Sequence, residues 1–246
     1  MPVLTGSFYS QSIDLTTSFT AVLPHEGTSE DNGNRPVLYL LHGLSDNHTN
    51  WLTNTSVARY ALARGFIVIM PEVTRSFYAD MKAGPKYFTY VSEELPKIAE
   101  SMFGFTHKRE NTFVAGLSMG GYGAMKCALS RPDFFAKAAS FSGALDIEYR
   151  CTKDFVPDFQ LCFGESIPSG SDLFALAEKV ALLPENKRPE LYFNCGTEDF
   201  LYKDNQNFKA KLDELAIHYT YEEWQGDHEW GFWDVSIQKA LDFFQK

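Results

Sequence analysis

Apolar runs alternate with stretches of helical periodicity along the chain from about Val37 to the C-terminus. The short apolar runs predict strands over Val37–Leu41, Phe66–Met70, Thr112–Ala115, Ala136–Phe141, Leu191–Asn194 and Tyr219–Glu223. Between them, helical spacing predicts helices over Thr55–Arg64, Phe88–Ser101, Met119–Ser130, Asp172–Leu182, Asn205–Ala216 and Gly231–Phe244. This alternation is typical of a mostly parallel sheet with crossover helices, so we expect an α/β fold with helices on both faces.

Two segments depart from this pattern. Polar and apolar residues alternate over Ser7–Leu15 and Ser18–Leu23, which predicts an antiparallel hairpin at the sheet edge. Residues 146–171, rich in Phe, Pro, Gly and acidic residues, have no clean period and predict either a small cap or a long surface loop. The length of 246 residues suits one α/β domain, so we expect residues 1–246 to form a single domain.

Composition narrows the classes of partner. The chain has 22 Lys and Arg against 32 Asp and Glu, and its net charge of -10 would repel nucleic acid and anionic lipid. It contains neither a signal-peptide pattern nor an apolar run long enough to span a membrane. The four cysteines lack paired C-x-x-C spacing, and neither H-E-x-x-H nor a P-loop occurs. We expect a cytoplasmic protein with reduced thiols, no metal and no cofactor.

A G-x-S-x-G motif lies directly between a predicted strand and a predicted helix, with Ser118 at its centre. The strand-to-helix turn is so tight that the residues two before and two after the serine must lack side chains, and Gly116 and Gly120 meet that demand. Such a turn leaves the hydroxyl exposed, so Ser118 is the predicted nucleophile. The amide of Met119, at the start of the helix, is the predicted donor to a developing oxyanion.

A His-Gly pair follows the first central strand, as in lipases and esterases. We expect the second oxyanion donor in this loop and choose the amide of Leu44. His42 is itself a candidate base, but its position in the loop favours a structural role in which its hydrogen bonds support the turn.

A serine nucleophile needs an imidazole base, and in this fold the chain order is serine, acid, histidine. Two histidines follow the nucleophile. His218 begins the last predicted strand, whereas His228 lies in the loop after that strand, where the fold gathers its catalytic groups. His228 is therefore the predicted base. The loop after the preceding strand holds two acids, Glu198 and Asp199, and both remain candidates to orient the imidazole.

In this order and at this spacing, the motifs resemble the esterase D branch of the α/β-hydrolases, most of all the bacterial tributyrin esterases. The resemblance covers almost the whole chain and lies in Val22–Pro24, Leu41–Leu44 with Trp51 beyond it, Gly116–Gly123, Cys195–Leu201 and Gly226–Trp230. It implies a serine carboxylesterase that hydrolyses short acyl esters, acetyl to butyryl, through an acyl-enzyme. It also implies that G-x-x-D supplies the triad acid, which favours Asp199 over Glu198.

Related enzymes leave alternatives open. S-formylglutathione hydrolases are also similar, but they generally run longer and carry a G-H-S-M-G-G-H elbow, where this chain has Leu117 and Tyr122. Carbohydrate acetyl and feruloyl esterases and mycolyl transferases share the fold. A thioester or carbohydrate substrate, acyl transfer, and an inactive binding protein therefore remain alternatives to the small-molecule ester. The family makes a homo-oligomer possible, although no residue indicates one.

Aromatic residues near the catalytic loops are candidates for the substrate pocket, because an apolar lining suits an acyl chain. They lie beside the segment Phe155–Phe163 and are Trp51, Phe77, Tyr78 and Trp230. Ordinary core packing is the alternative for each. In the loop after the second central strand, Arg75 and Asp80 are candidates to contact a polar leaving group, with surface ion pairing as the alternative.

Overall fold

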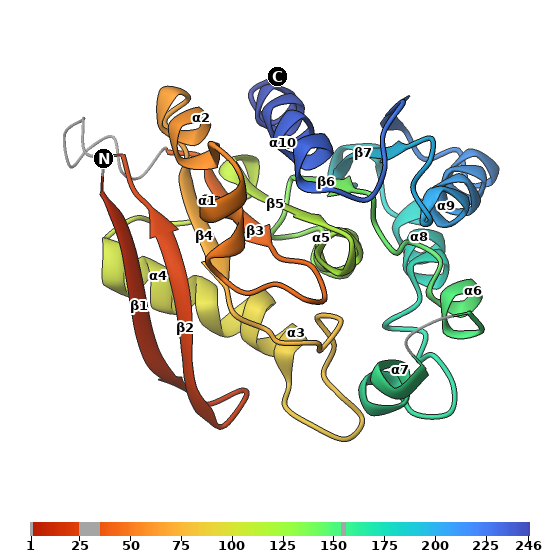
Figure 1. The fold of residues 1–246 in the computed structure, drawn as a ribbon, viewed down its shortest axis with the longest axis horizontal. Coiled ribbons are helices and arrows are strands. Elements are labelled where there is room, and N and C mark those ends of the chain that lie inside the picture. Colours follow the sequence, from red (N-terminus) through yellow and green to blue (C-terminus); the bar gives the residue numbers. More distant parts are fainter. Residues whose placement is uncertain (1, 25–34, 154–155) are drawn as a thin grey trace.

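The computed structural model describes residues 2–24, 35–153 and 156–246. Its centre is an eight-stranded sheet in the order β1-β2-β4-β3-β5-β6-β7-β8 (Figure 1). The strands are β1 (Val3–Ser10), β2 (Leu15–Val22), β3 (Val37–Leu41), β4 (Ile67–Pro71), β5 (Thr112–Leu117), β6 (Lys137–Phe141), β7 (Glu190–Gly196) and β8 (Tyr219–Trp224). β1 and β2 pair antiparallel with their neighbours, and all other pairs are parallel. The predicted fold class is confirmed.

Helices lie between the strands along the chain. They are α1 (Asn50–Asn54), α2 (Val57–Ala63), α3 (Tyr87–Thr89), α4 (Leu95–Phe103), α5 (Met119–Ser130), α6 (Ile147–Cys151), α7 (Val156–Phe163), α8 (Leu173–Ala181), α9 (Tyr202–Glu214) and α10 (Trp230–Phe244). A π-helical turn, η2 (Tyr90–Glu94), precedes α4, and two short 3-10 turns are η3 (Arg109–Asn111) and η4 (Glu185–Lys187). None of the described helices has both the length and the apolar character that a membrane crossing requires.

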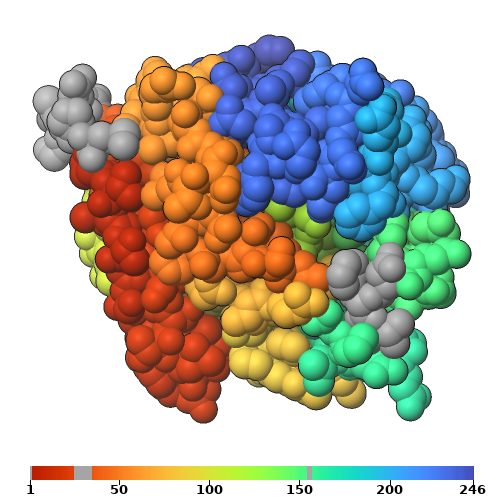
Figure 2. Space-filling model, viewed as in Figure 1, coloured from red at the N-terminus to blue at the C-terminus, as the bar shows by residue number. Residues whose placement is uncertain are grey.

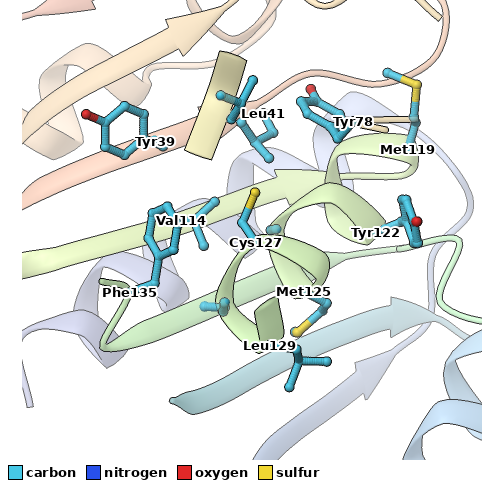
Figure 3. Close-up of a cluster of buried hydrophobic side chains, with 14 of the residues drawn as sticks. Tyr39, Leu41, Tyr78, Val114, Met119, Tyr122, Met125, Cys127, Leu129 and Phe135 are labelled. Carbon is cyan, nitrogen blue, oxygen red and sulfur yellow. The ribbon is translucent and has the colours of Figure 1, made fainter. Parts of the chain in front are cut away.

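The central strands β3, β4, β5 and β6 are buried on both faces. Successive side chains of a strand point to opposite sides, so each of these strands contributes to two layers of the core. In β3, Tyr39 and Leu41 belong to the layer that contains α4, α5, α8 and α9, whereas Leu38 and Leu40 pack in the layer of α1, α2 and α10. Figure 3 shows part of the first layer, in which Cys127 of α5 lies against the sheet. Strands buried on both faces read as continuous apolar runs, which explains why the sequence revealed them.

The helices that follow β3 lie next to the C-terminal helix α10, although they are far apart in the sequence. Figure 2 shows the segment around α1 and α2, in orange, next to the C-terminal helix, in blue. The carboxylate of Asp234 in α10 accepts hydrogen bonds from the amide of Ser56 at 3.0 Å and the hydroxyl of Tyr60 at 2.9 Å. These contacts fix the helix that follows the candidate base against the helices that follow the first central strand.

The N-terminal hairpin forms with boundaries that differ from the prediction. The predicted strands Ser7–Leu15 and Ser18–Leu23 become β1 and β2, which start earlier and leave residues 11–14 for the turn. Glu94 of η2 shapes this turn, because its carboxylate accepts hydrogen bonds from the amides of Gln11 at 2.7 Å and Ser12 at 3.0 Å. A partner more than eighty residues away in sequence therefore sets the strand ends, which periodicity alone does not reveal.

Candidate active site

Ser118 lies between β5 and α5 in a strained backbone conformation, with φ 54° and ψ -118°. Two close approaches explain the glycines of the motif. A Cβ atom on Gly116 would lie 2.4 Å from the carbonyl oxygen of Gly120, and one on Gly120 would lie 2.4 Å from the carbonyl oxygen of Leu41. Since nothing larger than hydrogen fits, the turn keeps its sharp shape, and the serine side chain reaches the cleft at the carboxyl edge of the sheet.

Three residues from three loops form one hydrogen-bonded chain. His228 Nε2 lies 3.0 Å from Ser118 Oγ, and His228 Nδ1 lies 2.9 Å and 3.1 Å from the two carboxylate oxygens of Asp199. Because a carboxylate only accepts, Nδ1 carries the proton in this arrangement and Nε2 accepts from the serine hydroxyl. The structure thus brings together the three predicted triad residues in the geometry that proton removal from serine requires.

The competing candidates lie elsewhere. Glu198 is exposed and accepts a hydrogen bond from Gln225 Nε2 at 3.2 Å. His218 precedes β8 at the opposite edge of the sheet, where its side chain is 92% exposed and lies 3.5 Å from Glu185. Neither residue therefore takes part in the hydrogen-bonded chain of Ser118.

The loop that carries the imidazole is held on both sides. The carboxylate of Asp227 accepts from the amide of His228 at 2.7 Å, and Glu229 caps α10 by accepting from the amides of its first turn. The imidazole packs between two rings, with centroid distances of 4.5 Å to Phe200 and 4.9 Å to Trp233. Backbone bonds and ring contacts together restrict the positions open to Nε2.

His42 supports the loop that carries Leu44, as its sequence position indicated. The side chain is buried, Nδ1 lies 2.7 Å from the carbonyl oxygen of Gly43, and Nε2 accepts from the amide of Val73 at 3.2 Å. Burial lowers the pKa of His42, which favours the neutral ring that this pair of bonds needs. The amide of Gly43 donates to the carboxylate of Asp46 at 3.1 Å. Both the carbonyl and the amide of Gly43 therefore have side-chain partners.

Trp51 and Tyr78 lie behind this loop rather than in the pocket wall for which they were candidates. Trp51 is 1% exposed, and its indole N–H donates to the carbonyl of Leu41 at 3.0 Å. Tyr78 is fully buried (Figure 3), and its hydroxyl donates to the carbonyl of His42 at 2.9 Å. Each ring carries one polar atom that satisfies a buried carbonyl, which explains why an aromatic residue with a donor occupies each position.

The hydroxyl of Ser118 faces a cavity of about 590 Å³. Its apolar and charged wall residues are Leu44, Leu117, Phe200, Trp230 and Trp233, with Asp46, Arg75 and Glu229. Leu44 and Trp230 line the cavity. Met119 is the buried first residue of α5, directly after Ser118, as the sequence predicted. Phe200 was not predicted as a pocket residue, although its position directly after the candidate acid could have indicated that role.

Arg75 and Asp80 have separate surroundings. The guanidinium of Arg75 makes two parallel bonds to Asp158 of α7, at 2.8 Å and 2.7 Å, at the edge of the cavity. The carboxylate of Asp80 instead accepts from the amide and the hydroxyl of Thr89, the last residue of α3, at 2.9 Å and 2.8 Å. Of the two candidates for a leaving-group contact, only Arg75 borders the cavity.

Comparison with known proteins agrees with this geometry. The Esterase family model matches residues 10–244. An acetyl esterase of Caldicellulosiruptor saccharolyticus is 31% identical over 100% of this chain and 99% of its own length. Two solved Staphylococcus aureus structures are also similar: the substrate-bound fluorophosphonate-binding serine hydrolase FphF (TM-score 0.90, 32% identity, 100% of this chain and 98% of that one) and the S-formylglutathione hydrolase FrmB (0.86, 34%, 100% and 99%). The chain therefore belongs to the esterase family and is a hydrolase of carboxylic esters with the α/β-hydrolase fold.

Proposed function

We propose that this protein is a serine carboxylesterase that hydrolyses short-chain acyl esters, acetyl to butyryl, through an acyl-enzyme. The observation that carries this proposal is the hydrogen-bonded chain from Ser118 through His228 to Asp199 at an open cavity. A nucleophile, a base and an orienting acid in this geometry are the set that acyl transfer to serine requires.

In the first half of the reaction, Ser118 Oγ attacks the ester carbonyl while His228 Nε2 takes the hydroxyl proton. The carbonyl oxygen becomes an oxyanion, and the amides of Leu44 and Met119 are its proposed donors. The imidazolium then gives its proton to the alcohol oxygen as the bond between that oxygen and the acyl carbon breaks. Asp199 holds the Nδ1 proton and stabilises the cation, and the acyl group remains on the serine.

In the second half, a water molecule takes the place of the departed alcohol. His228 removes one proton from the water as its oxygen attacks the acyl carbon, and the same two amides hold the second oxyanion. The proton then returns to Ser118 Oγ, the acyl bond breaks, and the carboxylic acid leaves. Each half uses the same residues in the same places, so a single rigid site serves both.

The preference for short acyl chains rests on the cavity wall and on one relative. Apolar side chains of Leu44, Leu117 and Trp230 stand beside the serine, which suits an acyl group of a few carbons. The similar protein of Caldicellulosiruptor saccharolyticus is named an acetyl esterase. Both facts support acetyl and butyryl esters as the substrate class.

A rate profile over acyl length tests this proposal. We expect kcat/KM to be highest for p-nitrophenyl acetate and butyrate, to fall for octanoate and to be lowest for palmitate. Ser118→Ala is expected to lower kcat by about 10⁴-fold or more on every ester, because the covalent route is lost. A maximum at palmitate would contradict the short-chain preference, and hydrolysis that survives Ser118→Ala would contradict the serine mechanism.

Thioester hydrolysis is a second candidate function. The structural similarity to the S-formylglutathione hydrolase FrmB favours it, as does the cation of Arg75 at the cavity edge, which is 51% exposed. The carboxylate of Asp158, paired with Arg75 by two hydrogen bonds, neutralises this charge and weakens its attraction for an acidic substrate. A kcat/KM for S-formylglutathione well above that for p-nitrophenyl acetate would make the thioester the preferred substrate.

We also propose that the chain forms one catalytic domain in which residues 146–171 are a small cap. The pair between Asp158 and Arg75 supports this role, because it joins α7 to the cavity edge. Residues 154–155 of the segment, which include Phe155, lie outside the described residues. Limited proteolysis that cuts the cap while both products stay associated and active would support one domain, whereas a separately folding fragment would contradict it.

A cytoplasmic location is part of the proposal, and the cysteines support it. All four are free thiols. Burial raises the pKa of Cys127 and Cys162 to about 12, which keeps these thiols protonated and slow to oxidise. We expect a thiol reagent to titrate all four cysteines after unfolding of protein purified from cytoplasm without reductant; fewer would indicate a disulfide and contradict the location.

A further inference from the structure

Phe200 presents an aromatic ring to the catalytic cavity. The side chain is 50% exposed, although it directly follows the buried Asp199. Its ring centroid lies 4.5 Å from that of the His228 imidazole, and it lines the cavity that Ser118 faces. A large apolar ring left open to solvent beside a reacting serine is a surface on which an apolar part of a ligand can rest.

A buried ion pair fixes this ring in place. Arg150 of α6 donates from Nη2 to the carbonyl of Phe200 at 3.2 Å, and its guanidinium carbon lies 5.6 Å from the centre of the phenyl ring. Arg150 also bonds to the fully buried Asp204 of α9, with Nε at 3.1 Å from the carboxylate. The contacts to main chain and ring restrict the positions open to Phe200 before any ligand binds, which lowers the ordering cost of binding.

The chemistry of the base decides which part of an ester meets the ring. His228 Nε2 must deliver its proton to the alcohol oxygen, so the carbon atoms attached to that oxygen lie close to the imidazole during the reaction. The same imidazole touches the Phe200 ring. The acyl carbonyl, by contrast, must face the amide donors at Leu44 and Met119. The alcohol part is therefore the part within reach of Phe200.

We propose, on the basis of the function proposed above, that Phe200 is a specificity-determining residue that binds the alcohol part of the substrate. The site then favours esters of flat apolar alcohols, such as benzyl alcohol, over esters of small alkyl alcohols. The charges around the cavity sharpen this class. Asp46 and Glu229 are acidic, and Arg75 is paired with Asp158, so an alcohol that carries a carboxylate gains no free cation here.

Two acetate esters that differ only in the alcohol test the proposal. Benzyl acetate and ethyl acetate release alcohols of similar acidity and form the same acetyl-enzyme, so the ratio of their kcat/KM values reports only contacts of the alcohol. Phe200→Ala is expected to lower this benzyl-to-ethyl ratio by about 5-fold, the size of one aromatic contact. Phe200→Tyr keeps the ring and is expected to keep the ratio. Met102→Ala, at an equally exposed residue of α4, is the control and should leave it unchanged.

A parallel ratio separates the two sides of the ester. The kcat/KM ratio of p-nitrophenyl butyrate to acetate reports the acyl side, and we expect Phe200→Ala to leave it unchanged. An unchanged benzyl-to-ethyl ratio in Phe200→Ala would overturn the assignment, even if both rates fall, and so would a change confined to the acyl ratio. Wild-type protein without Ser118-dependent hydrolysis of any ester would overturn the proposed function together with this inference.

Discussion

The two sides of the nucleophile are built differently. On the side of the proposed oxyanion donor Leu44, the side chains of His42, Trp51 and Tyr78 are buried and bond to carbonyl groups of residues 41–43, at the start of the loop that we call the oxyanion loop. None of these three side chains lines the cavity. On the opposite side, the proposed acid Asp199 and base His228 lie in two loops, here called the triad loops, and the ring of Phe200 next to them is open to the cavity. The oxyanion loop is therefore an extension of the core, whereas the triad loops also form the substrate surface.

This difference predicts how substitutions divide between stability, rate and specificity. Changes behind the oxyanion loop remove buried hydrogen bonds, so they should lower the free energy of unfolding and kcat together. Changes at the exposed surface of the triad loops should alter the choice of substrate with little loss of stability. The following variants test this division, from the largest expected effect to the smallest.

Asp199→Asn is expected to have the largest effect. The amide can donate to Nδ1, which favours the imidazole tautomer that no longer accepts the serine proton, so kcat should fall by about 10⁴-fold. Steady-state kinetics with p-nitrophenyl acetate measure this loss, with Glu198→Gln as the matched control at the neighbouring acid. A loss of similar size in Glu198→Gln would contradict the choice of acid.

Tyr78→Phe tests the support behind the oxyanion loop. Removal of the hydroxyl leaves the buried carbonyl of His42 without this donor, which should cost about 1–3 kcal/mol of unfolding free energy. We also expect kcat to fall by about 10-fold with little change in KM, because the loop positions a donor used in the transition state. Chemical unfolding and steady-state kinetics check the two effects. Tyr9→Phe, at an exposed residue of β1, is the control. An unchanged kcat in Tyr78→Phe would contradict the prediction that Tyr78 helps to position the oxyanion loop.

Lys126 contacts Tyr78 behind the oxyanion loop, and its burial should make the stability of the protein depend on pH. Its ammonium group donates to the carbonyl of Tyr78 at 3.1 Å and to Ser171 Oγ at 3.2 Å, and burial lowers its pKa to about 8. A lysine in the unfolded chain keeps its ordinary pKa of 10.5, so between these two values the unfolded chain binds a proton that the folded protein lacks. The contribution of Lys126 to the free energy of unfolding therefore rises with pH across this interval.

Thermal unfolding of wild type and Lys126→Met measures this contribution. We expect the difference in Tm, wild type minus variant, to increase from pH 7 to pH 10 by at least about 2 °C, which corresponds to roughly 1 kcal/mol in a chain of this size. Lys97→Met, at an exposed lysine of α4, removes the same charge and should show no such trend. A Tm difference that is constant or shrinks with pH would contradict the lowered pKa.

Arg75→Met should have the smallest effect. Its pair with Asp158 is partly exposed, and such pairs contribute at most about 1 kcal/mol to stability. We expect less than about a 3-fold change in kcat/KM for p-nitrophenyl acetate, measured alongside Asp158→Asn, which breaks the pair from the α7 side. A larger loss in Arg75→Met alone would show that the guanidinium itself contacts neutral esters.

The parts of the site whose backbone geometry demands particular residues could be predicted from the sequence. The turn at Ser118 accepts only glycine at positions 116 and 120, so the motif and its location follow from local sterics. The candidate acid and base could also be predicted, because the loops at the carboxyl edge of a parallel sheet lie close together. The residues alone left both Glu198 and Asp199 as candidates for the acid. Only the resemblance to the esterase D family favoured Asp199.

The roles of the aromatic residues were beyond the sequence. Trp51 and Tyr78 each have an apolar ring and one donor, and that composition suits a pocket wall as well as a buried support. Only the folded path of the loop after β3 shows that its carbonyls need those donors. Phe200 presents the reverse case: it faces the cavity, and its contacts with Arg150, which lies fifty residues earlier in the chain, form only in the folded protein.

The covalent intermediate offers the most direct test of the central claim, that Ser118 accepts the acyl group. Protein quenched in acid during turnover of p-nitrophenyl acetate can be digested and analysed by mass spectrometry. We predict one acetyl group on the peptide that contains Ser118, and none on the corresponding peptide of Ser118→Ala. Acetylation of a different residue at the rate of turnover, or continued turnover of Ser118→Ala at the wild-type rate, would contradict the account.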